Sequence, residues 1–177
     1  MSEARKKHGI GLLLPDRFVH SVTEVDPAEL KAQGIAGLIL DLDNTIVEWQ
    51  REEMSEEVIG WLQAIKEQGI QLCILSNSFM SDRSIRIAER LEGIAIKKAQ
   101  KPRRQGFRAA MLKMGTTPAQ TAIVGDQMFT DVLGGNRAGI YTIMVQPLHG
   151  REFAYTKYVS RPPEKMLLKY FRRRGHL

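Results

Sequence analysis

Short apolar runs alternate with helical patterns along most of the chain, and this alternation limits the possible folds more than any other feature. The runs cover residues 36–40, 70–75, 94–96, 121–124 and 140–145. Each is almost continuously apolar rather than alternating with polar residues, which is typical of parallel strands buried on both faces. The pattern therefore predicts five strands in the interior of one sheet.

Helical segments fill the intervals between these runs. We expect four of them, each followed by a glycine, at residues 56–68, 82–92, 103–114 and 131–138. Ser55 is an N-cap candidate for the first, and Gly69 ends it. Strands and helices in this order predict an α/β fold, with a doubly wound parallel sheet and right-handed crossovers.

Cysteine content and hydropathy narrow the class of protein further. With 177 residues, 43% of them hydrophobic, the chain can bury the core of one domain. Cys73, the single cysteine, excludes an internal disulfide and any multi-cysteine zinc site. Apolar runs stay well below the ~18 residues of a membrane-spanning helix. We expect a cytoplasmic protein that is soluble or bound peripherally at the inner face of the membrane.

Positive charge is concentrated at the C-terminal end. Residues 151–177 hold 8 of the 26 Lys and Arg but only 2 of the 20 Asp and Glu, so the net charge of +6 lies in this segment. Helical projection of residues 164–174 separates a basic face from an apolar arc of Met166, Leu167, Tyr170 and Phe171. We predict a domain of residues 1–150 and a basic amphipathic tail of residues 151–177.

The tail has two interpretations. Its apolar face can dock on or beside the domain and leave its charges in water. Alternatively, the helix lies on an anionic membrane surface, where each Lys or Arg contributes ~1 kcal/mol. An apolar stretch at residues 12–15 would then join it on the membrane.

Two carboxylates follow the first apolar run directly, in the stretch LILDLDNTIVEW of residues 38–49. Side chains alternate along an extended backbone, so Asp41 and Asp43 are expected to point the same way and Leu42 the other. Burying carboxylates without a partner is unfavourable, and the pair therefore indicates a nearby cation.

Polar side chains also follow the later runs. Ser76 and Asn77 come after the second run, Lys101 after the third and Asp126 after the fourth. The carboxyl ends of parallel strands meet at one edge of a sheet, where ligands bind. Carboxylates without a thiol or histidine cluster suit Mg²⁺. Cationic and hydroxyl donors beside them suit a phosphoryl group that a carboxylate attacks in line.

Four stretches together resemble a known family. They are DLDNT at 41–45, SNS at 76–78, Lys101-Pro102 and GDQMFTD at 125–131. In order and placement they resemble the motifs of the haloacid dehalogenase (HAD) superfamily, over about residues 10–150. The likeness is greatest to its subfamily IIIA, the YqeG-like and phosphatidylglycerophosphatase-like phosphatases. The resemblance implies a Rossmann-like fold and a phosphatase reaction through an aspartyl-phosphate.

The resemblance also implies roles for individual carboxylates. Asp41 would be the nucleophile and a Mg²⁺ ligand. Asp43 would be the general acid and base and would offer its backbone carbonyl to the metal. Asp126 would complete the metal site. Asp131 would either contact the metal ligands without binding the metal itself or serve as an alternative ligand. Thr45 would support the site.

The same resemblance assigns the phosphoryl oxygens to Ser76 and Lys101, and we expect Asn77 to bind phosphate with them. The residues alone leave open that Ser76 and Asn77 cap the next helix instead. Only one helix fits between Thr45 and Ser76, and one between Ser76 and Lys101, so we expect no cap domain. An open site of this kind suits bulky substrates better than small metabolites.

The phosphorylated substrate has three candidate classes. A lipid phosphate such as phosphatidylglycerophosphate agrees with the resemblance and with a basic tail at a membrane surface. The alternatives are a HAD-like protein associated with nucleic acid or the ribosome, through phosphate contacts of the tail, and a soluble metabolite phosphatase. Among these we favour the lipid phosphate, and nucleic acid is a less favoured partner.

Overall fold

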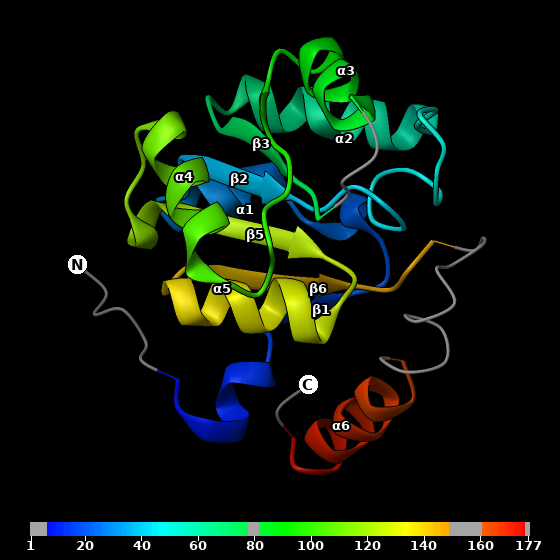
Figure 1. Cartoon of the computed structure of the whole chain (residues 1–177), viewed down its shortest axis with the longest axis vertical. Helices are drawn as coiled ribbons and strands as arrows, with labels where there is room; N and C mark the ends of the chain where they lie inside the picture. Colours follow the sequence, from blue (N-terminus) through cyan, green and yellow to red (C-terminus); the bar gives the residue numbers. More distant parts are fainter. Residues whose placement is uncertain (1–6, 78–81, 149–160, 176–177) are drawn as a thin grey trace.

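A single six-stranded sheet forms the centre of the computed structural model, which describes residues 7–77, 82–148 and 161–175 (Figure 1). Its strands, in chain order, are β1 (Arg17–Val19), β2 (Gly37–Leu40), β3 (Gln71–Leu75), β4 (Ile94–Ile96), β5 (Thr121–Gly125) and β6 (Tyr141–Val145). Their order in the sheet is β1-β6-β5-β2-β3-β4, and all neighbours pair in parallel. The chain winds outward from β2 to β4 and then returns to β5, so winding reverses between β2 and β5.

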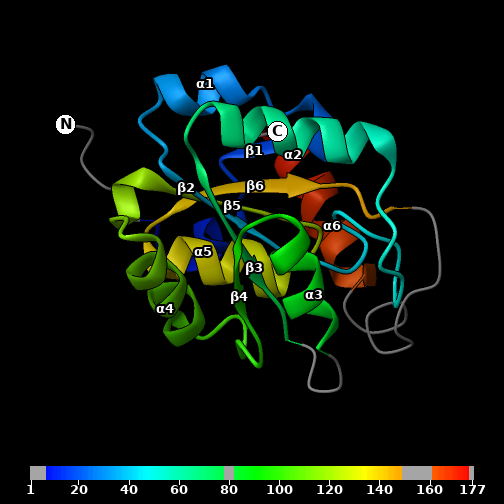
Figure 2. The ribbon, with the colours of Figure 1, turned by 90° about the horizontal axis from the view of Figure 1, so that it is seen from above.

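Helices cover both faces of this sheet. They are α1 (Pro27–Ala32), α2 (Glu56–Glu67), α3 (Arg83–Arg90), α4 (Arg104–Met114), α5 (Leu133–Ala138) and α6 (Arg161–Arg173). Short turns of 3-10 helix occur at η1 (Gly9–Leu13), η2 (Val22–Glu24) and η3 (Pro118–Gln120), and η4 (Met128–Val132) is a π-helical turn. Figure 2 shows α1 and α2 above the sheet and α4 and α5 below it. The predicted doubly wound α/β fold is thereby confirmed.

Each face has its own apolar core. On one side, Leu62 and Ile65 of α2 pack in a cluster with Leu38 and Leu40 of β2. On the other, Phe107 of α4 lies in a second cluster with strand residues that point the opposite way. Strands buried on both faces explain why the apolar runs were nearly continuous.

The helix after β2 begins as its sequence predicts. The Ser55 hydroxyl accepts a hydrogen bond from the backbone N–H of Val58, and Glu56 and Glu57 lie in the first turn. Carboxylates at this end interact favourably with the helix dipole. Only α2 with β3, and α3 with β4, occupy the described parts of the two gaps where a cap domain could have been inserted.

Besides the short 3-10 and π-helical turns, one strand and one α-helix were not predicted. The edge strand β1 has three residues and α1 has six, so neither carries a long periodic signal. The expected helix of residues 131–138 also differs, because its α-helical part begins at Leu133 and the π-turn η4 precedes it.

Adjacent glycines let α5 approach its neighbours closely. A Cβ atom on Gly134 would lie 2.5 Å from ring atoms of Phe107 in α4. One on Gly135 would lie 2.6 Å from the methyl group of Thr142 in β6. Both contacts are shorter than side chains tolerate, and larger residues here would push α5 away from the sheet.

The C-terminal helix α6 packs through Leu167, Leu168 and Phe171, whereas Met166 and Tyr170 of the predicted apolar arc are exposed. Phe171 is buried in a third cluster with Met128, Val132 and Met144, and Leu13 packs against this cluster from the N-terminal segment. The predicted boundary at residue 150 lies outside the described residues, within 149–160. Within the described ranges, no helix combines the length and the apolar character needed to cross a membrane.

Candidate active site

Three buried carboxylates meet at the carboxyl ends of the central strands. Asp41 directly follows β2, Asp126 directly follows β5, and Asp131 lies in η4. Each offers an oxygen atom within 4.8 Å of the others, and all three side chains are almost completely buried. The reversal of winding between β2 and β5 brings Asp41 and Asp126 to adjacent strand ends.

A buried lysine joins this group. Lys101 Nζ lies 2.5 Å from Asp41 Oδ1 and 2.7 Å from Asp131 Oδ1. Its backbone is held by Asn77, whose Oδ1 accepts from the Lys101 N–H at 2.7 Å and whose Nδ2 donates to the Lys101 carbonyl at 3.1 Å. The loop after β3 therefore fixes the position of the loop after β4.

Burial and charge act together on these groups. Burial raises the pKa of the Asp41 carboxyl, and the ammonium of Lys101 opposes this effect. For Lys101, burial alone would lower the pKa, but Asp131 and Asp41 outweigh it and raise the pKa above its ordinary value. The ammonium therefore remains charged at physiological pH.

The donor set fits a divalent metal ion. The three carboxylates offer oxygen atoms close to one another, and Lys101 contacts two of these groups, Asp41 and Asp131. All close ligand atoms are carboxylate oxygens, which suit Mg²⁺ better than zinc or copper. The Thr45 hydroxyl lies 3.5 Å from Asp126 Oδ1 and supports that carboxylate from the loop after β2.

Gly125 makes room for Asp131. A Cβ atom on Gly125 would collide with the carboxyl carbon of Asp131, so no larger residue fits there without moving the carboxylate. Asp131 Oδ2 also accepts a hydrogen bond from the Gln127 N–H at 3.1 Å. The glycine immediately before Asp126 was the sequence signal for this close approach.

Asp43 faces a different cation from Asp41. Both of its carboxylate oxygens lie 2.5 Å from Arg83 Nη2, and Oδ1 accepts from the Gln50 N–H at 3.0 Å. The extended backbone of β2 ends at Leu40, and Asn44 adopts a left-handed conformation with φ of 61°. The two carboxylates therefore have different cationic partners, and the expectation that they point the same way stays a prediction.

Arg83 was missed by the sequence analysis. It is buried at the start of α3, and its Nη1 donates to the Arg51 carbonyl at 3.1 Å. An arginine at a helix start carries no motif of its own. Only the fold reveals that it is the partner of Asp43.

Ser76 and Asn77 lie at the end of β3 and do not cap the next helix. That helix, α3, begins at Arg83 after Asp82, while Ser78 lies outside the described residues. The backbone of Ser76 instead joins β3 to the β4 loop, since its N–H donates to Ile96 and its carbonyl accepts from Ala99. Both polar groups of the Asn77 side chain are engaged with Lys101, so we assign Asn77 to positioning that lysine.

Comparisons with known proteins agree with this geometry. A family model described as haloacid dehalogenase-like hydrolase matches residues 15–139. A Bacillus subtilis (strain 168) protein named "Probable phosphatase YqeG" is 38% identical over 165 residues, covering 93% of this chain and 94% of its own. Phosphatidylglycerophosphate phosphatase 1, chloroplastic/mitochondrial, of Arabidopsis thaliana is 27% identical over 92% of this chain, which spans 49% of the plant protein.

Solved structures share the fold at low sequence identity. The crystal structure of an uncharacterized protein from Listeria monocytogenes serotype 4b superposes with a TM-score of 0.51 and 16% identity. The match covers 76% of this chain and 99% of the Listeria chain. This likeness concerns the fold alone. The family model and the Bacillus relative show that the chain belongs to the haloacid dehalogenase-like hydrolases, as an enzyme of their phosphatase type.

Proposed function

We propose that this phosphatase is a Mg²⁺-dependent phosphomonoester hydrolase that acts through an aspartyl-phosphate on Asp41, with an anionic lipid phosphate as its substrate. The observation that carries the mechanism is the buried contact of Asp41 with Lys101, beside Asp126 and Asp131. A carboxylate next to a fixed ammonium at the open edge of a sheet can attack a phosphoryl group whose charge that ammonium offsets.

In the first step, an oxygen of Asp41 forms a bond to phosphorus as the bond from phosphorus to the ester oxygen breaks. Lys101, in contact with Asp41, donates hydrogen bonds to the phosphoryl oxygens. The Ser76 hydroxyl, at the end of β3, donates a further hydrogen bond to them. Asp41, the Asp43 carbonyl and Asp126 would hold Mg²⁺, which would supply the charge that reduces repulsion between nucleophile and phosphate. Asp131 is an alternative ligand in contact with Lys101.

Asp43 carries the protons in both steps. It gives a proton to the departing alkoxide, and it then accepts one from the water that attacks phosphorus. The bond between phosphorus and Asp41 breaks in the second step and releases inorganic phosphate. Arg83 and the Gln50 N–H orient the Asp43 carboxylate beside the nucleophile loop.

Replacing the nucleophile tests the mechanism. Asp41→Asn should abolish Mg²⁺-dependent turnover of para-nitrophenyl phosphate, and acid quenching should trap phosphorylated protein only with the wild-type chain. Glu53→Gln, an exposed carboxylate outside the site, is the matched control and should retain full activity. Wild-type turnover by Asp41→Asn would rule out Asp41 as the nucleophile.

A lipid phosphate is supported by two observations. The Arabidopsis relative is named for phosphatidylglycerophosphate, and no cap domain intrudes on the described site, which leaves room for a bulky substrate. The basic face of α6 further suits contact with an anionic membrane, which flotation with anionic liposomes would test. Substitution of exposed basic residues is preferable to truncation there, because truncating α6 would also remove Glu164, which contacts the Met128 N–H.

A further inference from the structure

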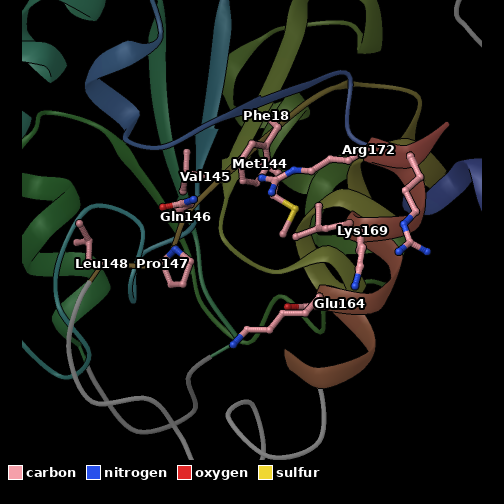
Figure 3. A pocket seen from close by; sticks show the side chains of 12 residues that line it. Phe18, Met144, Val145, Gln146, Pro147, Leu148, Glu164, Lys169 and Arg172 are labelled. Carbon is pink, nitrogen blue, oxygen red and sulfur yellow. The ribbon is translucent and has the colours of Figure 1, made fainter. Parts of the chain in front are cut away.

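A cavity of about 940 Å³ lies between α6 and the carboxyl end of β6, as Figure 3 shows. Residues of β1, β6, the segment after β6 and α6 line it. Its size is in the range of pockets that bind organic ligands, and it exceeds what a phosphate ion alone would fill. None of its lining residues belongs to the catalytic group described above.

The lining combines an apolar floor with a basic rim. Apolar surface comes from the strands, the segment after β6 and α6, namely Phe18, Met144, Val145, Pro147, Leu148 and Leu168. The rim comes from one side of α6, where the spacing of the cations at helical intervals brings them together. These cations are Lys165, Lys169, Arg172 and Arg173.

The positive charges of the rim are available to bind a negatively charged ligand. Within residues 7–77, 82–148 and 161–175, none of the four cations forms an ion pair with a carboxylate. Arg172 stacks over the ring of Phe18 at 5.4 Å, which places a cation directly against the apolar floor. An occupant complementary to this lining is both apolar and negatively charged.

Two hydrogen bonds connect this cavity to the catalytic loops. The Leu148 N–H donates to the carbonyl of Asn44, the residue after Asp43, at 2.9 Å. On the other wall, Glu164 is buried and accepts from the Met128 N–H at 3.0 Å, two residues after Asp126. The cavity therefore borders the loops that carry the reacting groups.

We propose that this cavity binds the non-reacting part of an anionic lipid phosphate, an inference that rests on the proposed function. An acyl chain occupies the apolar floor, and a phosphodiester of the same molecule contacts the Lys165 and Lys169 side of the rim. Nucleotides and sugar phosphates provide the charge but leave the apolar floor without a partner. Remote contacts of this kind raise affinity for the substrate without taking part in the chemistry.

Direct binding tests the cavity independently of catalysis. Dihexanoyl phosphatidylglycerol, which has a phosphodiester and short acyl chains but no phosphomonoester, is titrated as monomers below its micelle concentration by calorimetry. The wild-type chain should bind it saturably. Lys165→Glu with Lys169→Glu should weaken binding at least tenfold, since both basic side chains are exposed and each reversal turns attraction into repulsion.

A matched double variant separates local from global charge. Arg108→Glu with Lys113→Glu makes the same charge change on exposed positions of α4, away from the cavity, and should bind within twofold of wild type. Dibutyryl phosphatidylglycerol should bind more weakly than the dihexanoyl lipid, because less apolar surface is buried.

The outcomes discriminate between the two proposals. No saturable binding by the wild type, equal weakening in both double variants, or affinity independent of acyl length would each overturn the cavity assignment. Absence of para-nitrophenyl phosphate hydrolysis would instead count against the proposed function and leave the binding result intact. Lipid binding with the predicted charge and chain dependence supports the cavity even in the Asp41→Asn chain.

Discussion

A single arginine decides where the carboxylate of Asp43 points. Arg83 contacts both oxygens of Asp43 and is itself tied to the Arg51 carbonyl, so the pair is fixed to the loop after β2. Because Arg83 lies at the start of α3, that helix takes part in positioning the acid and base of the proposed reaction. Arg83 is therefore a positioning residue rather than a catalytic one.

Replacing the guanidinium group of Arg83 should lower kcat more than it changes substrate binding. Arg83→Lys keeps a cation but loses the planar pair of donors, and we expect kcat for para-nitrophenyl phosphate to fall about tenfold with KM nearly unchanged. Arg90→Lys, in the last turn of the same helix, is the control. An unaltered kcat would remove Arg83 from the mechanism.

Individual residues differ in how far their sequence context reveals their role. Cys73 lies in the apolar run 70–75, which predicted a buried strand, and it is buried, with burial raising the pKa of its thiol to about 12. Ser55 was predicted as an N-cap and is one. The Arg83 contact and the two Asn77 contacts with Lys101 span 40 and 24 residues of sequence, and no local pattern encodes such distances.

At the scale of elements, the π-turn η4 is the segment on which the acidic cluster depends. It carries Asp131 and begins two residues after Asp126. Its position relative to β5 relies on the contact of Asp131 with Gly125, where a side chain would collide. The sequence predicted a helix here but not the π-turn, since the pattern of apolar residues resembles an ordinary first helical turn.

A methyl group at this contact should disturb the cluster. Gly125→Ala would place Cβ against Asp131 and displace that carboxylate, so we expect the Mg²⁺ concentration for half-maximal activity to rise about tenfold or more. Gly60→Ala is the matched control, because a Cβ there meets nothing within 4 Å inside α2. The control should keep its metal dependence and gain about 0.5–1 kcal/mol of stability. Normal metal dependence in Gly125→Ala would show that Asp131 does not support the metal site.

At the scale of the whole molecule, the order of strands brings the site together. The alternation of apolar runs predicted a parallel sheet, and a parallel sheet with reversed winding places the loops after β2 and β5 side by side. That much of the site followed from the sequence. The position of α6 beside β1 and β6 could not be predicted from the sequence. It depends on packing among Leu13, Met144 and Phe171, which are far apart in the chain.

The carboxylate cluster that the fold brings together should make the stability of the protein depend on divalent metal. Mg²⁺ binds the assembled carboxylates of the native state but finds no such cluster in the unfolded chain, so saturating metal at 100 times Kd should add about 2.7 kcal/mol. Thermal unfolding with Mg²⁺ and with a chelator measures this. Asp126→Asn should lose most of the gain, whereas Glu53→Gln should keep it. An equal gain in Asp126→Asn and wild type would place the metal elsewhere.

The hydrogen bond from the Met128 N–H to Glu164 couples the docking of α6 to the position of the π-turn that carries part of the acidic cluster. Met128 belongs to the same π-turn as Asp131, so a ligand that favours the docked helix also favours the ordered turn. If the ligand raises the affinity of the acidic cluster for metal by some factor, then bound metal must raise the affinity for the ligand by the same factor.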